Sequence, residues 1–116
     1  MPCPGKLPRL HRMTEPLFQP VLPIDALPEN SSTAVTLSGM SIALCHSQGE
    51  IFAIENRCSH ADEPLACGRM RLGWIACPAH GARFDLATGE ALGPPANAPI
   101  RTFAVRVSDG MIEVGV

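Results

Sequence analysis

At 116 residues the chain has the size of one ordinary domain and is too short to hold two full hydrophobic cores. Hydrophobic residues make up 46%, enough to bury a core, and charged residues at 17% are too few for a disordered polyelectrolyte. The 12 prolines and 10 glycines exclude a helical bundle. A formal net charge of −2 argues against a nucleic-acid-binding protein, and no apolar run is long enough to span a membrane. We therefore expect a small, soluble, turn-rich domain of the all-β class.

The first twelve residues differ in composition from the rest. They contain Lys6, the only lysine, with two arginines and three prolines, but no apolar stretch of the length that a secretory signal needs. Two interpretations stay open: a disordered basic tail, or a mis-assigned start upstream of a natural beginning at Met13. Residues 13–116 alone hold six basic against eleven acidic residues, a net charge of −5. Without an export signal we expect a cytoplasmic protein with reduced cysteines.

The residue pattern along the chain predicts strands separated by turns. The expected elements are one short helical candidate at 23–29 and strands at 33–37, 41–45, 51–54, 100–107 and 111–114, with turns at 38–39, 47–50 and 108–110. Alternation should place Phe103, Val105 and Val107 on one side of the sheet. The expected architecture is a small β-sandwich or barrel with an insertion from Asn56 to about Ala98, too long for an idle loop.

Two short motifs within this insertion carry the chemistry. Cys58-Ser-His60 and Cys77-Pro-Ala-His80 are separated by the sixteen residues 61–76, and each supplies one thiolate and one imidazole. Such soft donors at near-neighbour spacing, on two facing loops, are typical of a metal site. The four side chains suit a tetrahedral zinc, or a binuclear iron–sulfur cluster with both cysteines on one iron and both histidines on the other.

The two motifs resemble the cluster-binding boxes of Rieske-type [2Fe–2S] proteins, in particular the small ferredoxins of bacterial aromatic-ring-hydroxylating dioxygenases. The likeness continues through residues 83–91, a proline loop at 93–96 and a closing hairpin at 100–114, and covers roughly residues 15–116. The resemblance implies a Rieske-type β-sandwich or barrel, residues 13–116, with a cluster-binding subdomain at about 56–98. It also implies that Cys58 and Cys77 bind the inner iron and that His60 and His80 bind the outer iron.

The resemblance bears on the reduction potential as well. Two histidines leave the oxidised site formally neutral, which raises the potential into a range of about −150 to +300 mV. Family members of high potential carry a disulfide across the cluster and two hydroxyl donors. Here Glu63 and Ala79 replace the disulfide cysteines, and Ala82 and Phe84 replace the Ser and Tyr hydroxyls. We therefore expect the low end of the range, about −150 mV.

The resemblance implies an electron carrier, which is not itself an enzyme, within a multicomponent dioxygenase. It would be a monomer that takes single electrons from an NAD(P)H-dependent flavin reductase and passes them to a terminal oxygenase. Two alternatives remain: a Rieske component of another redox system such as nitrite reductase, or a zinc-stabilised structural or interaction module. The acidic balance of residues 13–116 suggests docking onto basic partner surfaces.

The other singled-out residues receive plain structural interpretations. Cys45 is expected in the core, and no role is expected for Cys67, which lies between the boxes. His46 is expected at the surface, and Trp74 beneath the cluster loops. Pro94 and Pro95 are expected to stiffen a loop that covers the cluster.

Overall fold

The computed structural model describes residues 18–59, 63–79, 81–94 and 98–115. Its elements are β1 (Phe18–Pro23), the 3₁₀ turn η2 (Ile24–Ala26), β2 (Ser31–Leu37), β3 (Met40–Ser47), β4 (Glu50–Glu55), β5 (Met70–Arg71), β6 (Trp74–Ala76), β7 (Arg83–Asp85), β8 (Thr102–Ser108) and β9 (Met111–Gly115). The expected all-β class is confirmed. In the described part of the chain η2 is the sole helical element, so no helix there could cross a membrane.

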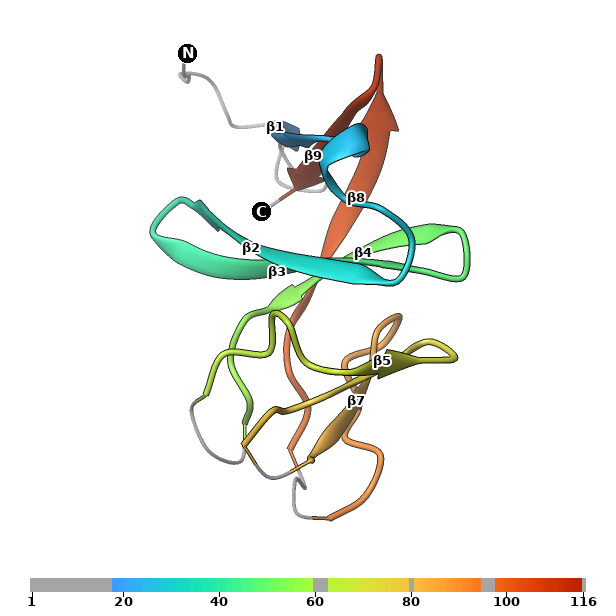
Figure 1. Ribbon diagram of the computed structural model, residues 1–116. Helices are drawn as coiled ribbons and strands as arrows, with labels where there is room; N and C mark the ends of the chain where they lie inside the picture. The colour runs from blue at the N-terminus through green and yellow to red at the C-terminus, as the bar shows by residue number, and fades with distance from the viewer. Residues whose placement is uncertain (1–17, 60–62, 80, 95–97, 116) are drawn as a thin grey trace.

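The strands form two sheets stacked one above the other (Figure 1). The larger sheet is antiparallel and curls into a half-barrel with the order β1-β9-β8-β4-β3-β2. The smaller sheet has the order β5-β6-β7 and lies wholly within the predicted insertion. The insertion therefore forms a layer of its own beneath the half-barrel.

Three hairpins of the larger sheet close in the same way. Each has two turn residues with positive φ, the second of which is glycine: Ser38-Gly39 (54° and 78°), Gln48-Gly49 (54° and 79°) and Asp109-Gly110 (52° and 78°). Such pairs form the turns whose twist matches that of the flanking strands. The predicted turns are confirmed, and they fix the registers Leu37↔Met40, Ser47↔Glu50 and Ser108↔Met111.

Strand β3 separates two hydrophobic cores because both of its faces are buried. Ile42 and Leu44 point into the barrel core, whose fully buried members are Leu27, Ile42, Leu44, Ala53, Ile112 and Val114. Ala43 and Cys45 point into the loop core, whose buried members are Ala43, Cys45, Ile54, Cys58, Leu65, Ile75, Cys77, Ala82, Phe84, Leu86 and Ile100. The loop core thus joins the half-barrel to the small sheet.

Several expectations are corrected in detail. The helical candidate at 23–29 is reduced to the three residues of η2, because the segment bends back at Leu27 to place that side chain in the barrel core. The last predicted long strand begins at Thr102, whereas Ile100 is buried ahead of it. Phe103 and Val105 pack against the barrel core as expected, and Val107 on the same side is 49% exposed because it lies near the free end of the β8–β9 hairpin. Strands β1, β5, β6 and β7 were not predicted.

Candidate metal centre

The two cysteines of the predicted site are buried in the same core. Cys58 is 0% exposed and Cys77 is 2% exposed, and both belong to the loop core. Cys58 follows strand β4 of the larger sheet, and Cys77 follows β6 of the smaller one. The fold therefore brings together two thiols from different sheets.

The first cysteine loop is held by the side chain of Asn56. Its Oδ1 accepts hydrogen bonds from the N–H groups of Leu65 and Ala66, both at 2.8 Å, and its Nδ2 donates to Ser41 Oγ at 3.0 Å. The N–H of Cys58 also donates to the carbonyl of Glu63 at 2.7 Å. These bonds tie both ends of the loop to β3 and fix the backbone at Cys58.

The second cysteine loop is a hairpin connection between β6 and β7. The N–H of Cys77 donates to the carbonyl of Ala82 at 2.7 Å, and the N–H of Gly81 donates to the carbonyl of Cys77 at 2.9 Å. Gly81 has a φ of 77°, a left-handed conformation that a side chain disfavours. Both backbone groups of Cys77 are thus bonded within the loop, which closes directly at this cysteine.

The two predicted histidines, His60 and His80, lie outside the described residues, as does Pro95 of the proline loop. Among the residues that are described, no group of three or more His, Cys, Asp or Glu side chains is placed to hold a metal. The structure thus brings together Cys58 and Cys77. The assignment of both histidines as ligands stays a prediction.

The chemistry of the two described donors fits a metal ion. A thiolate in an apolar core is unfavourable unless a cation neutralises it, because burial penalises the charged form. Cys45, which is also in the loop core, shows this effect: burial raises the pKa of its thiol from 9.0 to about 12. Two buried sulfurs on two clamped loops are donors that suit an iron–sulfur cluster or zinc.

The described residues on either side of the proline loop are hydrogen-bonded to β7 and to the first cysteine loop. On one side, the N–H of Leu92 donates to the carbonyl of Arg83 in β7 at 2.9 Å. On the other, Ser59 Oγ donates to the carbonyl of Ala98 at 2.6 Å, which links the residue after Cys58 to the end of the proline segment. The described residues that flank the proline loop are thus bonded to β7 and to the first cysteine loop, and the covering role of the loop stays a prediction.

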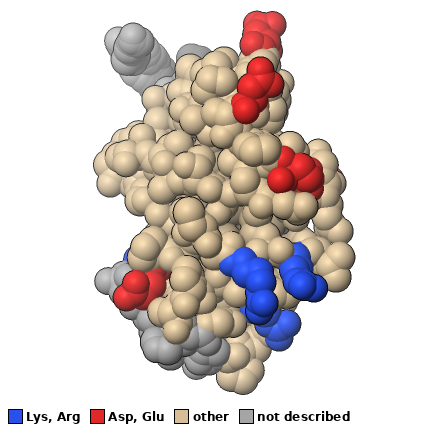
Figure 2. Space-filling model, in the orientation of Figure 1, with Lys and Arg blue, Asp and Glu red and all other residues tan. Residues whose placement is uncertain are grey.

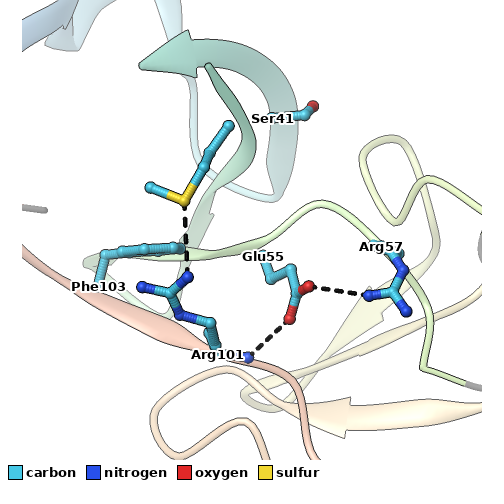
Figure 3. Close-up of a pocket in the computed structure, with 6 residues that line it drawn as sticks. Ser41, Glu55, Arg57, Arg101 and Phe103 are labelled. Atoms are coloured by element: carbon cyan, nitrogen blue, oxygen red, sulfur yellow. Dashed lines mark hydrogen bonds and ion pairs between the residues drawn. The ribbon is translucent and has the colours of Figure 1, made fainter. Parts of the chain in front are cut away.

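A small pocket of about 170 Å³ lies where the first cysteine loop meets the larger sheet (Figure 3). Glu55, at the end of β4, pairs with Arg57 Nη1 at 3.2 Å and accepts a hydrogen bond from the N–H of Arg101 at 3.1 Å. The Arg101 side chain lies 5.0 Å from the ring centre of Phe103 and contacts Met40 Sδ. Glu55 thus links the start of the first cysteine loop at Arg57 to the segment that leads into β8 at Arg101.

The remaining sequence interpretations have mixed outcomes. Cys45 is in the core as predicted, whereas Cys67 is exposed with a φ of 71° and donates its N–H to Ser32 Oγ at 2.7 Å. His46 is not an ordinary surface residue: it is partly buried, its Nδ1 bonds the carbonyl of Leu27 at 2.8 Å, and its Nε2 lies 3.2 Å from Glu29.

Trp74 does not lie beneath the cluster loops. It is partly buried on the outer face of the small sheet, where the guanidinium of Arg83 lies 5.4 Å from its ring centre. Its neighbour Ile75 points inward instead and belongs to the loop core. In a three-residue strand only one face can point to the core, and here that position belongs to Ile75.

Sequence reasoning missed two residues that position the site, Asn56 and Ser59. An Asn at a strand end is a common acceptor for loop N–H groups, so Asn56, two residues before Cys58 of the first box, was a usable signal. Nothing in the sequence indicated the bond from Ser59 to Ala98, because the two residues are 39 positions apart.

Comparisons with known proteins agree with this geometry. The model of the Rieske [2Fe–2S] domain family matches residues 18–104. The 3-phenylpropionate/cinnamic acid dioxygenase ferredoxin subunit of Photorhabdus laumondii is 38% identical over 97 residues, which cover 83% of this chain and 91% of that protein. The ferredoxin component of the naphthalene 1,2-dioxygenase/salicylate 5-hydroxylase systems of a Ralstonia species is 36% identical over 86 residues, 74% of this chain and 83% of that one.

A solved structure shows the same fold at nearly full length. The ferredoxin of carbazole 1,9a-dioxygenase from Nocardioides aromaticivorans superposes with a TM-score of 0.81 at 31% sequence identity. The superposition covers 84% of this chain and 96% of that one. The likeness therefore includes both the half-barrel and the inserted small sheet.

Proposed function

This chain belongs to the family of Rieske [2Fe–2S] ferredoxins, and we propose that it carries single electrons from an NAD(P)H-dependent flavin reductase to a terminal oxygenase that hydroxylates aromatic rings. As a ferredoxin it is an electron carrier and not itself catalytic. The observation that carries the proposal is the likeness to dioxygenase ferredoxins over nearly their whole length, combined with two buried cysteines on two clamped loops.

The protein binds a Rieske [2Fe–2S] cluster, as its family does. We assign Cys58 and Cys77 to the inner iron and His60 and His80 to the outer iron. When bound, the cluster supplies a reversible one-electron couple. This chain's own residues bury the two sulfurs away from water, and the Asn56 clamp holds the first loop in place. With four protein ligands, no coordination position is left for a substrate.

We further infer a potential at the low end of the Rieske range, about −150 mV. Hydrogen bonds to the sulfurs raise the potential because they stabilise the extra electron. Ala82 and Phe84 are fully buried beside Cys77 in the loop core and carry no hydroxyl to donate. Ala79 and Glu63 are exposed and cannot form a disulfide. A low potential suits a carrier that passes electrons onward.

The first test is electron paramagnetic resonance of the dithionite-reduced protein, purified without air. The expected result is the rhombic signal of a histidine-ligated [2Fe–2S] centre. A silent sample that contains zinc by elemental analysis would support the structural-module alternative and refute electron carriage.

The second test identifies the client. The reduced protein is mixed with terminal oxygenases of the naphthalene and the 3-phenylpropionate/cinnamate dioxygenase systems, and its reoxidation is followed by absorbance. We expect reoxidation by at least one oxygenase at a rate that depends on oxygenase concentration. A cluster that reduces normally but reacts with neither oxygenase, and instead with a nitrite reductase, would favour the alternative of a Rieske component of a nitrite reductase system.

A further inference from the structure

The outer face of the small sheet gathers exposed cationic and apolar side chains. Strand pairing places Arg71 opposite Trp74 and Arg83 opposite Ala76, so these side chains share one face. The inward face of the same strands carries the remaining side chains, Met70, Ile75 and Phe84, which pack into the loop core. We define the arginine face as Arg69, Arg71, Leu72, Trp74 and Arg83.

The arginines of this face have few acidic partners within the protein. Arg69 and Arg71 are exposed, and among the described residues neither has an ion-pair partner. Arg83 is exposed and lies over the Trp74 ring. Asp85 shares the face, but its Oδ1 accepts the N–H groups of the following turn at 2.8 and 3.1 Å. The face is therefore positive.

Charge is distributed unevenly over the molecule. Residues 13–55 and 99–116 together hold seven acidic against two basic residues, whereas residues 56–98 hold four of each. Figure 2 shows the basic side chains of the visible face gathered over the small sheet, while acidic side chains lie mainly over the larger sheet. The net negative charge is thus carried by the half-barrel, whereas the inserted layer with both cysteines has no net charge.

The arginine face also has an apolar component that the fold itself does not use. Leu72 is 80% exposed at the tip of the β5–β6 hairpin and has a φ of 45°, unfavourable for a branched side chain. Trp74, two residues further along the same hairpin, is partly buried. Surfaces that combine apolar side chains with Trp and Arg are typical of protein interfaces, where Trp and Arg are enriched at the centre.

We propose that the arginine face is the docking surface for an acidic surface of the flavin reductase. This inference rests on the proposed function. Strand β6, which carries Trp74 on this face, ends at Ala76 directly before Cys77, so the face is continuous along the chain with the second cysteine loop. The expectation of basic partner surfaces, drawn from the net charge, is replaced by an acidic partner at this end of the molecule.

The redox cycle favours the reductase over the oxygenase as occupant. The reductase must bind the oxidised carrier and release the reduced one. A reduced carrier is one charge more negative, so its attraction to an acidic surface is weaker. A positive docking face therefore binds its acidic partner more tightly before the electron arrives than after it, which matches the order that the reductase needs.

The test compares two double variants with the same change in net charge. Arg69→Gln/Arg71→Gln removes two positive charges from the arginine face. The control Thr36→Glu/Ser108→Glu adds two negative charges at exposed positions of the larger sheet. The measured quantities are the Kd of the oxidised ferredoxin for the flavin reductase of the 3-phenylpropionate/cinnamic acid dioxygenase system, and the rate constant of its reduction, at low and high salt.

We expect the arginine variant to weaken binding and slow reduction about five- to tenfold at low salt, with the difference shrinking at high salt. The control should change both by less than about twofold, and Leu72→Ser should weaken binding about two- to threefold at either salt concentration. Electron transfer from the reduced variant to the terminal oxygenase should be unchanged.

Three results with the variants would overturn the inference. Wild-type behaviour of the arginine variant would show that the face does not dock the reductase. Equal losses in the variant and the control would show that only net charge matters. A loss confined to transfer to the oxygenase would assign the face to that partner instead. If the wild-type protein forms a normal cluster but accepts no electrons from the reductase, the proposed function fails, and the inference fails with it.

Discussion

Gly89→Ala tests how tightly the proline loop is anchored to the rest of the domain. Gly89 has a φ of 79°, and its carbonyl accepts a hydrogen bond from the N–H of Ile100 at 2.9 Å. This bond joins the chain just before the proline loop to the chain just after it. A methyl group on Gly89 would overlap the carbonyl oxygen of Ile100 and contact Thr102 Cγ2 at 3.2 Å.

The cost of this substitution has two parts that a control can separate. An alanine with positive φ costs about 1–2 kcal/mol on its own. Overlap with a backbone oxygen forces the two segments apart, which adds about 1–3 kcal/mol for overpacking and about 1 kcal/mol for the lost hydrogen bond. Gly110→Ala is the matched control, because Gly110 has a φ of 78° and an added methyl there would have no neighbour within 4 Å.

The assay is urea unfolding of the cluster-loaded protein, followed by circular dichroism and by visible absorbance under anaerobic conditions. Gly110→Ala should lower the free energy of unfolding by about 1–2 kcal/mol. Gly89→Ala should lower it by a further 2–4 kcal/mol, approximately, and should release the cluster at lower urea. Equal losses in the two variants would refute the reasoning, since they would show that φ alone determines the cost.

Three further predictions concern the metal centre and its surroundings. His80→Ala should lose the cluster absorbance, whereas Cys67→Ser should keep it; a colourless Cys67→Ser protein would overturn the assignment of that exposed residue. Asn56→Ala should cost about 2–4 kcal/mol, because two loop N–H groups lose their acceptor, while Asn56→Asp should retain most of the stability; urea titration of both variants measures this. Cys45 should resist iodoacetamide in the native protein because burial raises its thiol pKa from 9.0 to about 12. Folding favours the neutral thiol, so the stability that depends on it is intact below pH 9 and declines from pH 9 towards 12. If the free energy of unfolding of the wild type, measured relative to that of Cys45→Ala, stays constant over this pH window, the prediction is wrong.

The half-barrel was largely predictable because its strands follow simple rules. Glycine turns at 38–39 and 109–110 bound runs of β-forming residues, and the strands lie where the pattern places them. Strand β1 was missed because Pro20 and Pro23 argue against a strand. Proline is tolerated there because β1 is an edge strand, which needs partners on one side only.

The small sheet could not be predicted from local pattern. Its strands are two or three residues long, too short to show an alternation. They are stable because Ile75 and Phe84 are buried in the loop core, which is a property of the tertiary structure. Motif spacing did single out Cys58 and Cys77, which the structure buries in the loop core, and their role as ligands stays a prediction. The clamp by Asn56 depends on residues 9 and 10 positions away and had no counterpart in the motif.

The double-sided burial of β3 has a consequence for how the cofactor is acquired. All fully buried members of the barrel core lie outside residues 56–98, so that core does not depend on the cysteine loops. When those loops open, β3 loses its packing on one face only and keeps Ile42 and Leu44 covered on the other. We therefore expect the half-barrel to stay folded in the apoprotein. Only residues 56–98 then have to become ordered when the cluster is inserted.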